Sequence, residues 1–203
     1  MLHGINISEE MSKKDIIITI LYILEKILEY TSKLDQTIPS IFDKKEKEVQ
    51  SKNVSDISTC PSDSNEENDT KTEETAKEKK YTLEEYICYW SEKMNFGENM
   101  LFLMMMNLDK ILNSKKVILN DKNIENILFT CMVLTQKFYE DEIFSDKDYS
   151  SLKKIECEEL ALMQVTFLDY INYSLYIKDE ELDGYKTRMR KVWEKNMLYL
   201  LKS

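Results

Sequence analysis

Cys131-Met-Val-Leu-Thr-Gln-Lys137-Phe138-Tyr-Glu-Asp141 is the most informative segment of this sequence. A mostly apolar run ends in a lysine, which an aromatic residue and two acids follow. A second helix is predicted to begin near Glu158. Its core-facing and boundary positions recur at helical spacing: Leu160, Met163, Gln164, Phe167, Leu168 and Ile171. These two helices are the centre of the predicted fold.

The composition favours an all-α protein. Only three Gly and two Pro occur in 203 residues, which is too little turn punctuation for a β-rich domain. Leu, Ile, Met, Glu and Lys dominate, and they are helix-favouring residues apart from Ile. The length is sufficient for one domain with a hydrophobic core.

The charge pattern argues against several classes of function. The net charge is -10 and no long block of Lys or Arg occurs, so we expect no nucleic-acid partner. The longest apolar run, residues 16–24, is too short to cross a bilayer, and we expect no membrane partner. Asp109 and Asp141 have no nucleophile, base or metal ligand at a useful spacing. We therefore predict a protein that is not an enzyme and needs no cofactor or metal.

The cysteines point to a reducing compartment. Cys60, Cys88, Cys131 and Cys157 follow neither a zinc-site spacing nor that of a small disulfide framework. In helical patterns a free Cys usually behaves as a small buried apolar residue. We expect an intracellular protein of the nucleus, the cytoplasm or both.

The chain divides into three predicted segments. Residues 9–36 form an amphipathic helix whose apolar seam must pack against another surface. Residues 43–80 lack large apolar side chains after Ile57 and are predicted to be a disordered acidic linker. Residues 81–203 hold the remaining helices.

Capping and breaking signals place these helices. Thr82 and Glu85 form a predicted capping box, and Gly97 is expected to supply a left-handed turn after the first helix. Asn120 or Asp121 is expected to cap the helix that ends near Tyr139. The helices are predicted at about 82–94, 98–113, 120–139, 157–172 and 179–201.

The order of the motifs resembles the P-type cyclins, the phosphate-signalling or U-type branch of the cyclin family. Leu108-Asp109-Lys110 is similar to a Leu-Asp-Arg motif of that branch. Lys137-Phe138-Tyr-Glu140-Asp141 resembles its Lys-Phe-x-Asp-Asp motif, and Glu159-Leu160 to Phe167-Leu168 resembles its Glu-Leu to Phe-Leu helix. Residues 21–28 and 82–90 resemble its two preceding helices. The sequence departs from the family at Asn123-Ile-Glu-Asn126, which lacks a His-Arg pair, and at Gln164, where cyclins generally carry glutamate.

This resemblance implies a single five-helix cyclin box with one added helix at each end. It also implies a regulatory subunit that binds and activates a cyclin-dependent protein kinase of the cell cycle or a related kinase, as a heterodimer. The kinase-binding residues implied in this sequence are Lys137, Phe138, Glu140, Gln164 and Phe167. The head group of Lys137 is expected to point outward.

Other interpretations of the same residues remain open. Lys137 could be a solvated lysine favoured by the helix dipole, and Gln164 a satisfied buried amide. A cyclin-fold protein of the transcription-factor type is one alternative. A helical adaptor that binds through Met104, Met105 and Met106 is another, although core packing is the favoured reading of these methionines.

Overall fold

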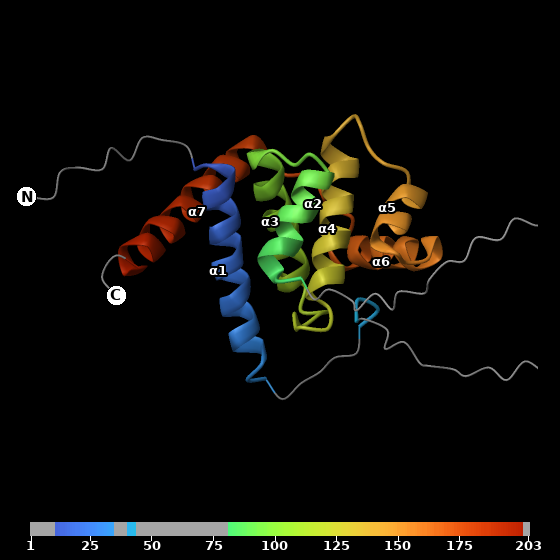
Figure 1. The fold of residues 1–203 in the computed structure, drawn as a ribbon, viewed down its shortest axis with the longest axis horizontal. Helices are drawn as coiled ribbons and strands as arrows, with labels where there is room; N and C mark the ends of the chain where they lie inside the picture. The colour runs from blue at the N-terminus through green and yellow to red at the C-terminus, as the bar shows by residue number, and fades with distance from the viewer. Residues whose placement is uncertain (1–10, 35–39, 44–80, 201–203) are drawn as a thin grey trace, which may run out of the picture. The chain divides into compact units, whose positions relative to one another are not determined.

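A computed structural model describes residues 11–34, 40–43 and 81–200 of the chain. Within those residues every regular element is a helix (Figure 1), and the all-α prediction is confirmed. The helices are α1 (Lys13–Thr31), α2 (Leu83–Lys93), α3 (Glu98–Asn113), α4 (Ile124–Tyr139), α5 (Asp146–Lys153), α6 (Cys157–Tyr170) and α7 (Asp179–Leu200). Apart from residue 43, the predicted linker 43–80 lies outside the described residues.

Helices α3 and α4 form the centre of the core. They pack against each other, α1 contacts α2, α3 and α7, and α6 contacts α4 and α5. Figure 1 shows α5 and α6 on one side of this pair and α1 on the other. On α3, Met104 and Met105 are fully buried and Met106 is partly buried against the core, which confirms the prediction that the methionine run packs in the core.

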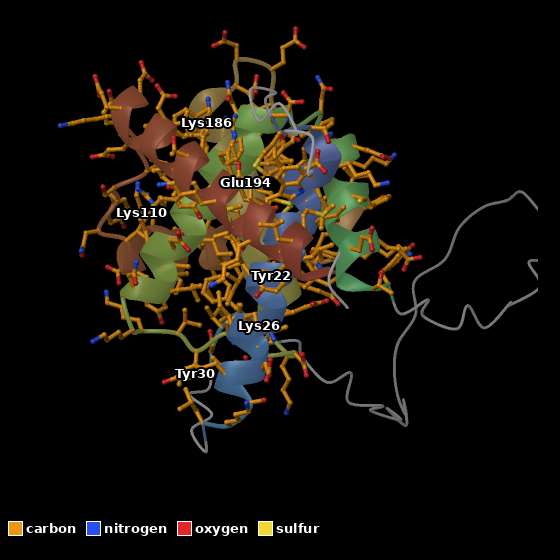
Figure 2. The ribbon with its side chains drawn as sticks, turned by 90° about the vertical axis from the view of Figure 1, so that its left-hand side faces the viewer. Tyr22, Lys26, Tyr30, Lys110, Lys186 and Glu194 are labelled. Atoms are coloured by element: carbon orange, nitrogen blue, oxygen red, sulfur yellow. The ribbon has the colours of Figure 1, made fainter. Side chains whose placement is uncertain are left out.

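Helix α1 buries one face against its neighbours. Ile16, Ile20 and Leu24, which follow one another at one-turn spacing, have no exposed surface. Tyr22 and Tyr30 occupy a different row of the same helix, which Figure 2 shows running down α1, and Tyr30 is exposed. Among the described residues the helix predicted over 9–36 spans only Lys13–Thr31, and its apolar face at Ile16, Ile20 and Leu24 packs on α2, α3 and α7.

Several helix ends are set by side chains that cap the backbone. Ser12, Thr82 and Ser145 each accept a hydrogen bond from the N–H three residues later, and the acid at that position bonds back to the cap. Such capping boxes satisfy two backbone donors that would otherwise have no partner. Because Ser12 is the cap, α1 begins at Lys13.

The structure also corrects two predictions about the segments between helices. Gly97 has φ −76° and caps α3, whereas Asn95 provides the left-handed residue with φ 52°. Asparagine tolerates that conformation better than most side chains. Helix α4 begins at Ile124 rather than near residue 120. The side-chain Oδ1 of Asn120 accepts hydrogen bonds from the backbone N–H groups of Lys122 and Asn123, and these bonds stabilise a turn before the helix.

Helix α5 was not predicted at all. It has only eight residues, Asp146–Lys153, and its apolar side chains are few. Ser145 followed three residues later by Asp148 is the capping signal that could have revealed it. With α5 included, helices α2–α6 make the expected five-helix box, and α1 and α7 are the added helices.

The Asp109-Lys110 pair holds α7 and the segment before it. The hydroxyl of Tyr185 on α7 donates to Asp109 Oδ2 at 2.9 Å. Lys110 Nζ donates to the carbonyl oxygens of Ser174, Leu175 and Tyr176 at 2.7, 3.2 and 3.3 Å. Figure 2 marks Lys110 on this side of the molecule, where Lys186 and Glu194 mark the course of α7. This part of the predicted motif is thus structural.

Candidate functional site

Lys137 joins three helices at one point on the surface. It lies in the last turn of α4, which ends because Glu140 adopts an extended conformation. Its Nζ donates to Gln164 Oε1 on α6 at 2.7 Å and to Asp146 Oδ1 on α5. The side chain is only 24% exposed. The head group expected from the sequence to point outward is therefore about three-quarters covered and paired within the chain.

Gln164 closes a ring of hydrogen bonds with these two residues. It is 7% exposed, and its Nε2 donates to the same Asp146 Oδ1 at 3.1 Å. Both polar atoms of the amide thus have a partner, as a buried amide requires. We refer to Lys137, Asp146 and Gln164 as the lysine cluster.

Asp146 carries the negative charge of the lysine cluster. Partial burial acts to raise the pKa of its carboxyl group, but the hydrogen bonds from Lys137 and Gln164 and the charge of Lys137 hold that pKa below its ordinary value. Asp146 is therefore ionised at neutral pH and compensates the ammonium group. Its side chain is 48% exposed.

A buried hydrogen-bond network lies next to the lysine cluster. The hydroxyl of Tyr149 on α5 donates to Gln136 Oε1 at 2.8 Å, and Gln136 Nε2 donates to the backbone oxygen of Met94 at 3.0 Å. Burial raises the pKa of Tyr149 to about 12, so its hydroxyl remains a donor. Lys137 Nζ lies 5.8 Å from the centre of the Tyr149 ring. Tyr149 therefore fixes the position of α5 relative to α4 beside the cluster.

Exposed apolar side chains come from the same elements. Five of them lie on α4, α6 and the α4–α5 connection and are between 38% and 55% exposed. They are Phe138, Ile143, Phe144, Leu162 and Val165, and we refer to them as the apolar rim. Leu162 and Val165 are three residues apart and so share one face of α6. Exposed apolar side chains on neighbouring elements are typical of an interaction surface.

Acidic residues dominate this part of the sequence. Residues 137–170 contain nine carboxylates and four lysines. Glu140, Asp141 and Glu142 are exposed directly before Ile143 and Phe144. The site therefore combines exposed apolar side chains with negatively charged neighbours, and its lysine, Lys137, is already paired with Asp146.

The predicted site residues fall into three groups. Lys137 and Gln164, 27 residues apart in sequence, are brought into direct contact. Phe138 and Glu140 are exposed beside them. Phe167 has no exposed surface and lies in the core, because it occupies the inward face of α6, so it cannot touch a partner directly. Sequence reasoning missed Asp146, whose only signal was the cap at Ser145.

The described residues hold no other constellation with evident chemistry. Among them, no group of three or more His, Cys, Asp or Glu side chains is arranged to bind a metal ion. Burial raises the pKa of the Cys131 thiol well above its ordinary value, which leaves it a poor nucleophile. None of the described helices combines the length and apolar character needed to span a membrane.

Comparison with known proteins identifies one family. The family model described as Cyclin matches residues 29–175, a range that contains α2–α6 and the whole lysine cluster. No curated protein matches the chain.

Proposed function

Because this chain belongs to the cyclin family, we propose that it is a regulatory subunit that binds and activates a protein kinase of the cyclin-dependent type. The observation that carries the proposal is the lysine cluster, which lies on the same helices and connection as the exposed side chains of the apolar rim. Members of the cyclin family are regulatory rather than catalytic subunits.

The apolar rim supplies the contact area for docking. Each of its side chains is about half exposed before binding and loses that exposure on docking. Burial of apolar surface contributes roughly 25 cal/mol per Å². The rim therefore favours a partner that presents apolar side chains, such as one face of an amphipathic helix.

Lys137 supplies specificity in the proposed complex. An ammonium group has three donors, and the contacts with Asp146 and Gln164 use two of them. The third can donate to an acceptor on the kinase. Because Asp146 already compensates the charge of Lys137, a neutral acceptor such as a backbone carbonyl suits this position better than a second carboxylate.

Activation is a population shift in the kinase. Docking favours the position of the mobile regulatory helix in which its glutamate pairs with the ATP-aligning lysine. The regulatory subunit contributes only the difference in its affinity for the two kinase states. In this proposal the groups that carry out phosphoryl transfer all belong to the kinase.

The finer assignment follows the motif order. The segments that precede and form the box resemble the P-type branch, so we place the protein there and expect it in the nucleus or cytoplasm with a cell-cycle or related kinase. The adaptor alternative receives no support from the methionine run, since Met104 and Met105 are buried. The acidic charge also disfavours a DNA-binding cyclin-fold protein.

Affinity capture from the protein's own cell extract tests the proposal, with bound kinases measured by mass spectrometry and by phosphorylation activity. Wild-type protein is expected to recover a kinase. Lys137→Ala is expected to weaken the captured complex by about 2–5 kcal/mol. Lys147→Ala is the matched control, because Lys147 is an exposed lysine of α5 outside the lysine cluster.

A second variant separates docking from folding. Val165→Lys places a charge on the apolar rim at a half-exposed position, so it should leave the melting temperature nearly unchanged while it abolishes capture. A wild-type protein that recovers no kinase, or capture that survives both Lys137→Ala and Val165→Lys, would rule out the proposed function.

A further inference from the structure

We propose that Asp146 and Gln164 act as one unit that positions Lys137, and that this surface works with a carboxylate at one of the two positions and not at both. The inference rests on the proposed function, since Lys137 is positioned for the kinase. Asp146 is thereby assigned a role as a positioning residue, although it lies on α5 and not on either helix that first suggested the site.

The contact geometry couples the two positions directly. Gln164 Nε2 and Asp146 Oδ1 are 3.1 Å apart, and Lys137 Nζ bonds to one oxygen of each residue. Gln164 donates to the carboxylate with one end of its amide and accepts from the ammonium with the other. This arrangement requires one residue of the pair to be anionic and the other to be a neutral amide.

A carboxylate at both positions would be unfavourable. With Gln164 replaced by glutamate, an oxygen would face Asp146 Oδ1 at about the distance where the amide nitrogen now lies. Two carboxylates in such contact cannot both ionise without a large cost, even with one lysine between them. Either one carboxylate would then take up a proton, or one of the two side chains would rotate away. In both cases Lys137 would lose one of its two acceptors.

A carboxylate at neither position would also be unfavourable. Lys137 is three-quarters covered, and its ammonium group would then face two neutral amides. A partly buried charge without a counter-charge is costly, and the side chain would turn toward solvent. Its donor would no longer be directed at a fixed point on the surface.

The local structure holds Asp146 in place for this role. It is the first residue of α5, directly after the Ser145 cap, and α5 is tied to α4 through the Tyr149–Gln136 hydrogen bond. The carboxylate can thus reach Lys137 only while the short helix remains docked. An ordinary acid in a first helical turn would need no such anchoring.

A double-mutant cycle tests the coupling: wild type, Asp146→Asn, Gln164→Glu and the double variant Asp146→Asn/Gln164→Glu. Each single change is expected to lower kinase affinity about tenfold. The double variant restores one carboxylate and one amide with their places exchanged, so its affinity should return to within about threefold of wild type. Asp141→Asn is the matched control, because it removes an exposed carboxylate of the same region and should change affinity little at about 0.15 M salt, where long-range steering is screened.

Thermal unfolding of the isolated variants gives a readout that needs no kinase. The same rescue should appear in the melting temperatures of the four proteins. If wild type captures no kinase, the proposed function fails, while the unfolding cycle still reports the pairing. The inference is overturned if the losses of affinity in the two single variants add up in the double variant. It is also overturned if Asp146→Asn changes affinity as little as Asp141→Asn does, or if the double variant recovers stability but not affinity.

Discussion

At the scale of single residues, Tyr149 links the core to the docking surface. Its ring is fully buried, packs edge-on against the half-exposed Phe144 at 5.6 Å and lies below Lys137. Its hydroxyl is the partner of a buried amide oxygen on Gln136. The Tyr149 side chain therefore packs α5 against α4 and also contacts Lys137 of the lysine cluster.

Tyr149→Phe should destabilise the protein by about 1–3 kcal/mol, because it leaves the buried Gln136 Oε1 without its donor. Chemical unfolding of the two proteins measures the difference. Tyr89→Phe is the control, since Tyr89 is exposed and keeps its ring contacts in the variant. Equal stability of Tyr149→Phe and wild type would show that the hydroxyl contributes nothing.

At the scale of helices, side-chain hydrogen bonds from α3 and α4 fix the irregular segment that precedes α7. Residues 174–176 precede α7 and expose backbone carbonyl groups that no helix satisfies. Lys110 bonds to three of these carbonyls, and the hydroxyl of Tyr139 donates to one of them, that of Leu175, at 3.0 Å. Burial lowers the pKa of Lys110 from its ordinary value. This lysine thus fixes where α7 begins.

Lys110→Met should loosen α7 because it keeps the apolar stem and removes the charged donor. The expected cost is about 1.5–3 kcal/mol, the range for a hydrogen bond to a charged group. Hydrogen exchange should rise in α7 and in residues 174–176 more than in α3 and α4. Lys191→Met, at an exposed position of α7, is the control. Uniform protection in both variants would contradict this account of Lys110.

At the scale of the whole molecule, charge governs encounter with a partner. The chain carries a net charge of -10, and residues 137–170 contribute nine carboxylates against four lysines. A field of this sign attracts a basic partner surface and repels an acidic one. Electrostatic steering acts on the association rate more than on the dissociation rate.

Association with the captured kinase should therefore slow markedly between about 0.01 M and 0.15 M salt, over which the Debye length falls from about 30 Å to about 8 Å. The variant Glu140→Gln/Asp141→Asn should slow association at low salt with little change in melting temperature. Glu180→Gln/Glu181→Gln removes two exposed carboxylates from α7 and is the matched control. Kinetic measurements in which both variants match wild type would exclude steering by this surface.

Local patterns alone determined the all-α class, the helical course of α2, α3 and α6 and the burial of the methionine run. These features depend on periodicity, caps and composition, which act over a few residues and are legible in sequence. The left-handed residue at Asn95 and the turn at Asn120 were misassigned, because several nearby residues carried equivalent turn chemistry.

Only the tertiary structure decided the make-up of the lysine cluster and the burial of Phe167. Asp146 belongs to a short polar helix that is held by Tyr149, and its contact with Gln164 spans 18 residues. Such a contact depends on how α4, α5 and α6 pack together, which no local pattern specifies. The sequence by itself determined the helices and the presence of Lys137, whereas packing determined which carboxylate pairs with it and which apolar side chains remain on the surface.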